Sequence, residues 1–290
     1  MEKNYLDLKN LLDNGQIKTN YELSGGMMNK SFVFSFENKE YVYYVPSEQA
    51  NEMVDRKLEE KAHKTIYSLG ITSKNIAFYD NGAKINEFIP GDSLNHVNEF
   101  DYKKIANMLH KLHDSKLNIG VDYDPFSKVL NYEKEALSLG IKLDEEYKQL
   151  LDVVLLKRDY LESFEKVLCH NDFQRSNIIK STDGNYYMID FEFAMNNDPY
   201  FDIAGFGNTV VEEGFELLKN YCNNLITRDD LERFFYWRIL LSLQWYLVAL
   251  IKDIRGEGKE HGYNFVEVAN FFLNNAHHAY ELLQEKLRGI

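Results

Sequence analysis

Cysteine is scarce in this chain of 290 residues. Cys169 and Cys222 are its only two cysteines, so the chain allows at most one disulfide and has no cysteine pair at metal-ligand spacing. Both stand in apolar stretches of the sequence, which favours buried, reduced thiols. The sequence therefore predicts neither a disulfide framework nor a paired-cysteine metal site.

Positive charge is also in short supply. The chain has 33 Lys and Arg residues against 46 Asp and Glu residues, a formal net charge of −13 at pH 7. Because nucleic-acid phosphates require a basic face, this balance argues against a nucleic-acid-binding protein. An acidic surface tolerates or attracts a cationic small molecule, although most of these charges are expected to be solvated surface.

Long hydrophobic runs and targeting segments are missing as well. The first residues, "MEKNYLDLKNLLDN", are charged and lack the apolar core of a signal peptide. The longest apolar run, residues 239–251, is too short for a bilayer span and contains Ser242 and Gln244, so we expect a buried helix. Internal repeats and low-complexity tracts are not visible. These features predict a soluble, cytoplasmic protein without a membrane span.

The residues that are present indicate a well-packed globular chain of two unequal lobes. Hydrophobic residues make up 44% of the chain, with 20 Tyr and 19 Phe. Helical spacing marks residues 4–13, and "SFVFSFENKEYVYYV" predicts a β-hairpin. Pro46 should end its second strand, and Ser47 should cap a helix that runs to about Leu69 and is closed by Gly70. "IAFYD" and "AKINEFI" predict another strand pair around the turn "DNG".

The remainder of the chain has a mainly helical pattern. "PGDSL" is expected to lead from a β-rich lobe, residues 1–90, into a helical lobe, residues 91–290. "FDYKKIANMLHKLHDS" has apolar residues on one helical face, and helical pattern recurs from about 131 to 163. His110 and His113 lack carboxylate or cysteine partners at ligand spacing, so we interpret them as ordinary helix residues. The oligomeric state is left open.

A polar segment stands between apolar runs in "VLCHNDFQRSNIIK", residues 167–180, where a hairpin is expected. Asp172 and Asn177 lie five residues apart in it, and "MIDFE" adds Asp190 and Glu192. Single Asp or Asn residues usually serve turns, as "DG" at 183–184 should, but this long ordered pattern is not explained that way. Carboxylate and amide oxygens suit Mg²⁺, and an uncoordinated carboxylate can accept a proton from an attacking hydroxyl. The pattern therefore predicts phosphoryl transfer.

"HNDFQRSNII" and "MIDFEFAMNNDPYFDIA" resemble the signature segments of the choline/ethanolamine kinase family, within the aminoglycoside-phosphotransferase-like and protein-kinase-like fold. "LSGGMMNKSFVF" resembles the nucleotide loop of its bacterial members, and "VDRKLEEKA", "INEFIPGDSL" and "MLHKLHDS" resemble the helix, hinge and helix that follow. The resemblance implies an α+β, bilobal fold with a small β-rich N-lobe and a larger, mainly helical C-lobe. It also implies a small-molecule kinase, a phosphotransferase with an alcohol group as acceptor, that uses ATP and Mg²⁺.

The resemblance also implies roles for individual residues. Asp172 would be the base or orienting carboxylate for the acceptor hydroxyl. Asn177 and Asp190 would be Mg²⁺ ligands, and Glu192 would be a carboxylate at the metal site or just behind it. Glu87 and Ile89 would contact adenine through their backbone groups. His170 and Asp202 would support the catalytic loop.

One position departs from the family pattern. "YVYYVP" stands where the family has a strand like "YVLRIP", whose Arg or Lys neutralises phosphates and pairs with a helix glutamate. That position here is Tyr44, while the glutamate is retained as Glu59. We expect Lys30 to supply the missing charge; Lys39 is a poorer candidate. Two hypotheses follow: an active kinase with rearranged phosphate contacts, which the intact Asp172, Asn177 and Asp190 favour, or a degraded kinase that binds ligand without efficient transfer.

The acceptor site is only partly matched. Choline requires an aromatic cage, and Trp245 in "LSLQWYLVALI" matches one family tryptophan, whereas the second falls on Val248. Tyr246 is a further candidate, with Trp237 and Tyr263 as other aromatics. Thr209 stands at the expected carboxylate, and Glu212 and Glu213 follow it. A small cationic acceptor, choline or ethanolamine, is predicted; an aminoglycoside, thiamine or an amino sugar stays open. A protein substrate is disfavoured because there is little room for an activation segment after Asp190.

Overall fold

The computed structural model describes residues 8–23, 29–47, 51, 54–258 and 264–289. Contacts divide the chain into two compact units, which we call the N-terminal unit (Met1–Lys104 with Arg175–Ala194) and the C-terminal unit (Ile105–Gln174 with Met195–Ile290). This division differs from the boundary expected at residue 90, because a segment from the middle of the chain belongs to the N-terminal unit. Each unit is described on its own.

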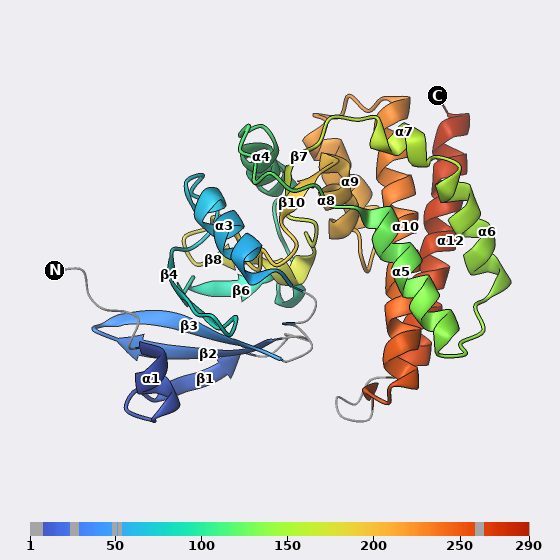
Figure 1. The fold of residues 1–290 in the computed structure, drawn as a ribbon. Helices are drawn as coiled ribbons and strands as arrows, with labels where there is room; N and C mark the ends of the chain where they lie inside the picture. Colours follow the sequence, from blue (N-terminus) through green and yellow to red (C-terminus); the bar gives the residue numbers. More distant parts are fainter. Residues whose placement is uncertain (1–7, 24–28, 48–50, 52–53, 259–263, 290) are drawn as a thin grey trace. The chain divides into compact units, whose positions relative to one another are not determined.

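The N-terminal unit is built on an antiparallel sheet of five strands in the order β1-β2-β3-β5-β4. Strands β1, β2 and β3 lie side by side in Figure 1. The strands are β1 Thr19–Leu23, β2 Asn29–Phe36, β3 Lys39–Pro46, β4 Asn75–Phe78 and β5 Lys84–Glu87. Glu37 and Asn38 both have positive φ, 49° and 62°, as the tight turn between β2 and β3 requires. Both predicted strand pairs, β2 with β3 and β4 with β5, are confirmed.

Alternation along the strands gives this sheet two different faces. One face carries Phe34, Tyr41, Tyr43 and Ile85, which form a buried cluster with Leu8 of helix α1 (Leu8–Asp13). Residues one position away along the strands, such as Tyr44 and Lys84, therefore lie on the opposite face. On that face Lys84 meets Glu59 of helix α3 (Arg56–Tyr67).

Helix α3 begins later than the sequence suggested. Its N-cap is Asp55, whose side chain accepts hydrogen bonds from the backbone N–H groups of Lys57 and Leu58, so α3 starts at Arg56. Asn51 is also helical, and its N–H donates to Ser47 O at 3.2 Å, so a helical residue follows Ser47 before α3 begins. An aspartate in this position satisfies free N–H groups and complements the helix dipole, and it thereby defines the first turn. Residues 48–50 and 52–53 lie outside the described residues. Gly70, with φ of +66°, follows the helix end, close to where the sequence placed it.

The polar segment 167–180 is not a hairpin, and this expectation was wrong. Its first strand, β7 (Val167–Cys169), pairs with β10 (Met195–Asn197) in the C-terminal unit. Its second strand, β8 (Ile178–Ser181), pairs with β6 (Gly91–Ser93) and β9 (Tyr186–Met188) in the N-terminal unit. The hairpin is instead β8–β9, which turns at Gly184 with φ of +81°. The apolar runs on either side of the polar residues each find a partner elsewhere in the chain.

The C-terminal unit is mainly helical. Its helices are α4 Tyr102–His113 (which begins in the N-terminal unit), α5 Pro125–Ser138, α6 Glu145–Leu155, α7 Arg158–Glu162, α8 Pro199–Phe206, α9 Val211–Tyr221, α10 Arg228–Ile254 and α12 Phe265–Arg288. The pattern expected from about 131 is thus three helices, the first of which starts at Pro125 behind the cap Asp124.

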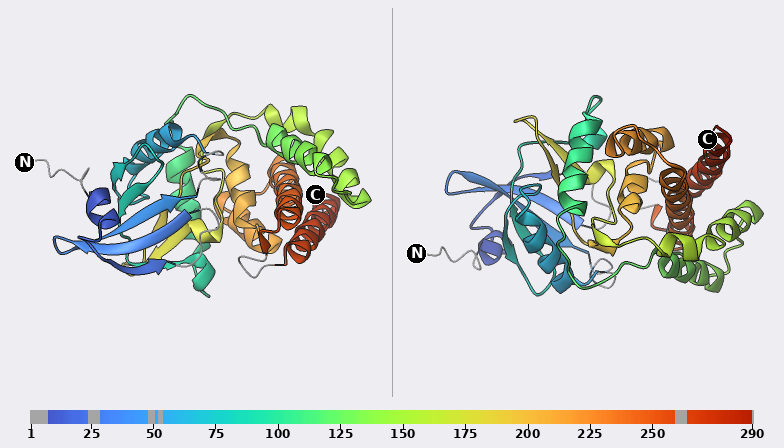
Figure 2. Two further views of the ribbon diagram at one scale, coloured as in Figure 1. Left: turned by 60° about the horizontal axis from the view of Figure 1, so that its bottom comes forward. Right: turned by 90° about the horizontal axis from the view of Figure 1, so that it is seen from above.

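Helix α10 is the core of this unit. It starts at a capping box of Thr227 and Asp230 and lies beside α12 (Figure 2). Among the described residues it is the one helix long and apolar enough to cross a membrane, but 83% of its most apolar window is buried inside the protein. Burial on all sides is what a central helix of a globular protein shows, so the predicted buried helix is confirmed.

Candidate active site

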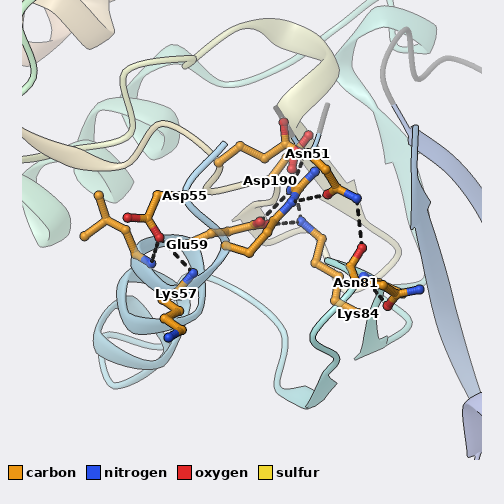
Figure 3. A network of polar contacts seen from close by, with 11 residues as sticks. Asn51, Asp55, Lys57, Glu59, Asn81, Lys84 and Asp190 are labelled. Carbon is orange, nitrogen blue, oxygen red and sulfur yellow. Dashed lines mark hydrogen bonds and ion pairs between the residues drawn. The ribbon is translucent and has the colours of Figure 1, made fainter. Parts of the chain in front are cut away.

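A buried cluster of charges lies on the α3 face of the N-terminal sheet (Figure 3). It contains the carboxylates of Glu59, Asp190 and Glu192, each with an oxygen atom within 4.8 Å of the others, and the cations Lys84 and Arg56. Lys84 Nζ forms an ion pair with Glu59 and lies 3.1 Å from Asp190 Oδ1. We call these five residues the charge cluster.

Arg56 ties the deeper carboxylates of the charge cluster together. Its Nη1 atom lies 2.7 Å from Glu59 Oε2 and 3.0 Å from Glu192 Oε1. Because Arg56 stands three residues before Glu59 on α3, both side chains project from the same side of the helix. The carboxylates of Glu59 and Glu192 raise the pKa of Arg56 against the opposing effect of burial. Glu59 and Glu192 therefore share the single positive charge of one fixed guanidinium.

Lys84 is charged although it is almost completely buried, with 2% of its surface exposed. Burial alone lowers the pKa of Lys84, but the adjacent carboxylates of Asp190 and Glu59 raise it more, and the net direction is upward. Sequence reasoning missed this residue. Its weak signal was a lysine in the first position of an apolar strand, in "AKINEFI", where a solvent-facing residue was the natural interpretation.

Asp190 and Glu192 converge for a different reason from the one expected. They were predicted to share one face of an extended segment, but Asp190 lies in the irregular segment just after β9, and Glu192 lies in the turn closed by the hydrogen bond from Ala194 N to Phe191 O. Asp190 itself has φ of +66°, in the left-handed region that non-glycine residues rarely adopt. The bend at Asp190 and the turn that follows it, and not strand alternation, bring the two carboxylates into the charge cluster.

Asn177 is held beside this turn by its own backbone. It ends the short 3₁₀ helix η3 (Arg175–Asn177), it is buried, and its carbonyl oxygen accepts a hydrogen bond of 3.0 Å from Ile189 N, next to Asp190. Asn177 offers an amide oxygen, and Asp190 a carboxylate that keeps 29% of its side chain exposed. This oxygen-only donor set fits a hard cation such as Mg²⁺. Glu192, paired with Arg56, is the less accessible of the predicted metal ligands.

In the C-terminal unit, Asp202 of α8 holds the loop that carries Asp172. Its carboxylate accepts hydrogen bonds from His170 N at 2.8 Å and Asn171 N at 2.7 Å, and lies 3.1 Å from His113 Nε2. His170 Nδ1 in turn accepts a bond from Asp172 N at 3.3 Å. Asn171 has φ of 62°, so the loop turns sharply just before Asp172. The arrangement braces the loop from below and leaves His170 in a supporting place.

A chain of hydrogen bonds runs to the Asp172 carboxylate from the middle of α10. Arg238 Nη2 donates to Asn208 Oδ1 at 3.2 Å, Asn208 Nδ2 donates to Gln174 Oε1 at 3.3 Å, and Gln174 Nε2 donates to Asp172 at 3.2 Å. We call this chain the amide relay. A guanidinium only donates and a carboxylate only accepts, so its two ends fix the orientation of both amides.

Arg238 is an unusual source for such a relay. It is fully buried, and its other bonds go to neutral oxygens of Ala204 and Ser242. Among the residues that the structure describes, no carboxylate pairs with it. Burial lowers the pKa of Arg238 to about 9, which still leaves it a cation at neutral pH. Sequence reasoning missed Arg238, Asn208 and Gln174, because bonds between distant elements leave no local pattern.

The residues predicted for nucleotide contacts lie on the N-terminal sheet or just after it. Glu87 ends β5, where its backbone N–H donates to Lys74 O at 2.9 Å, and Ile89 follows two positions later. Lys30 is exposed on β2 opposite Val45. The cations beside Glu59 are Lys84 and Arg56, so the position that the sequence assigned to Lys30 is occupied by other residues. Residues 24–28, in the predicted glycine-containing loop, lie outside the described residues.

The two aromatic residues predicted for the acceptor have different surroundings. Trp245 is partly exposed and stacks on Phe272 of α12, with ring centroids 5.9 Å apart. Tyr246 is buried against Tyr147, and its hydroxyl accepts a hydrogen bond from Asp144 N at 3.1 Å, as a core tyrosine does. Of the two, Trp245 has the accessible ring. Tyr263 lies outside the described residues.

The nearby acidic candidates also have partners of their own. Glu212 Oε1 lies 2.6 Å from His278 Nε2. Thr209, at the expected carboxylate position, has a neutral side chain, and its backbone oxygen accepts a hydrogen bond from Asn275 Nδ2. These residues therefore give no carboxylate at the position where the family resemblance placed one.

A β-rich unit with a buried lysine–glutamate pair, and a helical unit with a braced aspartate loop, define the protein-kinase-like fold in its small-molecule kinase form. The family model for choline/ethanolamine kinase matches residues 21–226, well over half of the chain. The chain belongs to the choline/ethanolamine kinase family and is a small-molecule kinase, as predicted.

Individual relatives agree with this assignment. The chain is 24% identical to the protein LicA of Haemophilus influenzae over 90% of its own length and 79% of that protein. Choline kinase LicA from Streptococcus pneumoniae has a similar structure, with a TM-score of 0.70 and 23% identity over 97% of this chain and 98% of the other. A structure of LicA in complex with AMP is similar too, with a TM-score of 0.69 and 24% identity over 97% and 96% of the two chains. The predicted bilobal, protein-kinase-like fold is confirmed.

Proposed function

We propose that this kinase uses ATP and Mg²⁺ to phosphorylate the hydroxyl group of a small amino alcohol, choline or ethanolamine. The observation that carries the proposal is the Asp172 loop, which is braced by Asp202 and supplied with a donor to its carboxylate by Gln174. An aspartate fixed in this way can accept one proton. Family membership and the AMP complex of LicA support a nucleotide as the other ligand.

The reaction assigns one task to each group. Asp172 accepts the proton as the acceptor oxygen forms its bond to the terminal phosphorus of ATP and the bond from that phosphorus to the ADP oxygen breaks. Asn177 and Asp190 would hold the Mg²⁺ ion, which neutralises phosphate charge when bound. Gln174 orients the Asp172 carboxylate, and Asp202 keeps the loop from moving. Glu87 and Ile89 offer backbone groups to adenine.

The acceptor is proposed to be a cation. The net charge of −13 favours accumulation of a positive ligand, and the partly exposed ring of Trp245 offers a face to an ammonium group. A quaternary ammonium cannot donate a hydrogen bond, so a ring face is the contact it requires. Aminoglycosides, thiamine and amino sugars are the alternatives that a substrate panel must include.

The test is ADP formation with Mg²⁺ and a panel of choline, ethanolamine, an aminoglycoside, thiamine and an amino sugar. We expect turnover with choline or ethanolamine, and loss of at least about a hundredfold in kcat for Asp172→Ala, since a general base contributes about 10²–10⁴-fold. Nucleotide binding with no turnover above the Asp172→Ala background, for every acceptor, would instead establish the degraded kinase.

Trp245 gives a separate test of the acceptor. We predict that Trp245→Ala raises the KM for choline by about 5- to 30-fold, from a lost cation–π contact of roughly 1–2 kcal/mol. Trp245→Phe, which keeps a ring, should retain most of the affinity, and the KM for ATP should not change in either variant. An unchanged KM for choline in Trp245→Ala would remove this residue from the acceptor site.

A further inference from the structure

We infer that Lys84 is the phosphate-binding cation of this kinase. In the family pattern this charge comes from an Arg or Lys at the position of Tyr44 on β3, whereas here it comes from strand β5. The inference rests on the proposed function, since it requires ATP as the ligand. It makes the neutral residue at position 44 compatible with an active enzyme.

The pairing register brings positions 44 and 84 together. Tyr44 of β3 stands directly opposite Lys84 of β5, within a run of four consecutive pairs without a shift. Residues opposite each other on antiparallel strands have their side chains on the same face, with Cβ atoms about 4.5–5.5 Å apart. Lys84 Nζ accordingly lies 5.0 Å from the centre of the Tyr44 ring. A lysine or arginine at either of these two positions therefore places its positive charge at nearly the same point.

The contacts of Lys84 are those that a phosphate-binding cation requires. Nζ pairs with Glu59, which fixes it, and lies 3.1 Å from Asp190 Oδ1, the carboxylate proposed to hold Mg²⁺. An ammonium group has three N–H donors, and these two carboxylates account for two of them. Phosphate oxygens that share a Mg²⁺ ion with Asp190 would come within reach of the third.

The other charges nearby cannot take this role. Arg56 pairs with Glu59 and Glu192, and of the two cations Lys84 is the one that pairs with Asp190, the proposed Mg²⁺ ligand. Burial raises the pKa of Tyr44 to about 12, so its hydroxyl stays neutral at physiological pH. Lys30 pairs with Val45, one position from Tyr44, and alternation therefore places it on the α1 face, away from Glu59.

A purely structural role explains Lys84 poorly. A buried ion pair is seldom more stable than apolar residues of similar size, because both charges lose their hydration. The charge cluster has three carboxylates, and Arg56 supplies one positive charge to two of them, so Lys84 also balances buried charge. A structural role leaves unexplained the contact of Lys84 with Asp190, whose carboxylate is 29% exposed and needs no buried partner. A charge needed for a phosphate ligand explains that contact.

The first experiment compares binding of ATP, ADP and AMP by titration calorimetry, with Mg²⁺ and without an acceptor. We expect Lys84→Met to weaken ATP binding by at least about tenfold and AMP binding by less than twofold, since AMP lacks the outer phosphates. Lys57→Met, which removes an exposed lysine of α3, is the matched control and should change neither. Equal losses for ATP and AMP, or no loss for ATP, would overturn the inference.

The second experiment moves the charge back to β3. Lys84→Tyr should lose ATP affinity. The exchanged pair, Tyr44→Lys with Lys84→Tyr, should bind ATP with at least a third of the wild-type affinity. A folded exchanged pair, with a wild-type melting temperature, that binds ATP no better than Lys84→Tyr would contradict the inference. If Lys84→Met fails to fold, Lys84→Met with Glu59→Gln removes both charges of the pair and carries the same comparison.

Failure of this inference can be told apart from failure of the proposed function. The binding measurements need no acceptor and no turnover, so they are unaffected by the choice between choline and other alcohols. If the wild-type chain turns over choline while Lys84→Met binds ATP as tightly as the wild type, the role of Lys84 alone is overturned. A wild-type chain that prefers ATP over AMP through Lys84, yet phosphorylates no acceptor, would overturn the proposed function alone.

Discussion

Two residues next to the chemistry adopt backbone conformations that side chains normally avoid. Asn171, just before Asp172, has φ of 62°, and Asp190 has φ of 66°. Such conformations cost on the order of 1–3 kcal/mol for non-glycine residues and persist where the surrounding structure enforces them. Here the enforcing contacts are visible: Asp202 binds Asn171 N, and Lys84 binds the Asp190 side chain. Positive φ also occurs at an ordinary turn such as Glu37–Asn38, so it is these contacts that distinguish the two positions.

His63 makes the stability of the fold dependent on pH. It is buried on α3, where its Nε2 atom lies 2.9 Å from the carbonyl oxygen of Ser73, and burial lowers its pKa to about 4. In the unfolded chain the pKa is about 6.5, so the unfolded state binds the proton first as the pH falls. The stabilising effect of neutral His63 is thus complete above about pH 6.5 and is lost as the pH falls toward 4.

We predict that the free energy of unfolding falls between pH 6.5 and pH 4 by on the order of 2 kcal/mol more in the wild type than in His63→Gln. Urea titrations at several pH values, in EDTA, measure this difference. His96→Gln, at an exposed histidine of the same unit, is the control and should follow the wild type. Parallel curves for the wild type and His63→Gln would mean that His63 does not titrate differently on folding.

At this scale the sequence predicted the residues whose spacing is local. Asp172, Asn177 and Asp190 stand in ordered motifs, and their chemistry could be proposed from residue type alone. Lys84 could not be found in this way, because its importance comes from standing opposite Tyr44 on another strand. Arg56 did have a local signal, since it precedes Glu59 by three residues on a helix, but nothing in the sequence indicated that both are buried.

Among the elements, α10 connects the core of the C-terminal unit to the Asp172 loop. Its middle carries Arg238, whose guanidinium begins the amide relay through Asn208 and Gln174. A buried cation without a carboxylate partner is costly. Arg238 nevertheless has a use, because through the amide relay it orients the Gln174 amide that donates to Asp172.

We predict that Arg238→Met lowers kcat by about tenfold, the effect of losing one oriented hydrogen bond of about 1.5 kcal/mol, with KM for ATP unchanged. A misoriented Gln174 would also move the acidic limb of the pH–kcat profile to higher pH, since a carboxylate that loses a donor is more easily protonated. Ser242→Ala removes a different contact of Arg238 and should keep the wild-type profile. A tenfold loss with an unmoved profile would point to a packing defect only.

The elements themselves were predicted unevenly. Both strand pairs of the N-terminal sheet followed from turns that join neighbours in the sequence, such as Glu37–Asn38. The partners of β7 and β8 did not follow, because β7 pairs with a strand beginning at Met195 and β8 with one beginning at Gly91. Two apolar runs around a polar segment resemble a hairpin, and only distant partners show otherwise. The start of α3 depended on choosing Asp55 over Ser47, which residue preferences alone do not decide.

At the scale of the whole molecule, the N-terminal unit is made from two separate pieces of chain. Residues 175–194 supply β8, β9 and Asp190 to a unit that is otherwise formed by the first 104 residues. Without them, β6 loses its strand partner, Lys84 loses Asp190, and Arg56 loses Glu192. The unit should therefore be incomplete as an N-terminal fragment.

We predict that a fragment of residues 1–104 shows little hydrogen-exchange protection in β5 and no cooperative thermal transition. The same fragment joined to residues 175–194 through a short glycine linker should gain protection in β5 and β6. The intact chain provides the reference. Protection of β5 in residues 1–104 that equals the intact chain would show that the second piece is not needed for this unit to fold.

The strand register at Tyr44 and Lys84 also affects how members of such families are sorted into active and inactive enzymes. A classification that inspects one alignment column would record a lost catalytic cation at position 44 and label the chain a pseudoenzyme. In a sheet, however, residues paired across neighbouring strands have adjacent side chains. A charge lost from one strand can therefore be supplied at the same place by the paired residue of the next strand. Comparisons made by spatial position across paired strands, and not by column, should return some apparently inactive relatives to the list of working kinases.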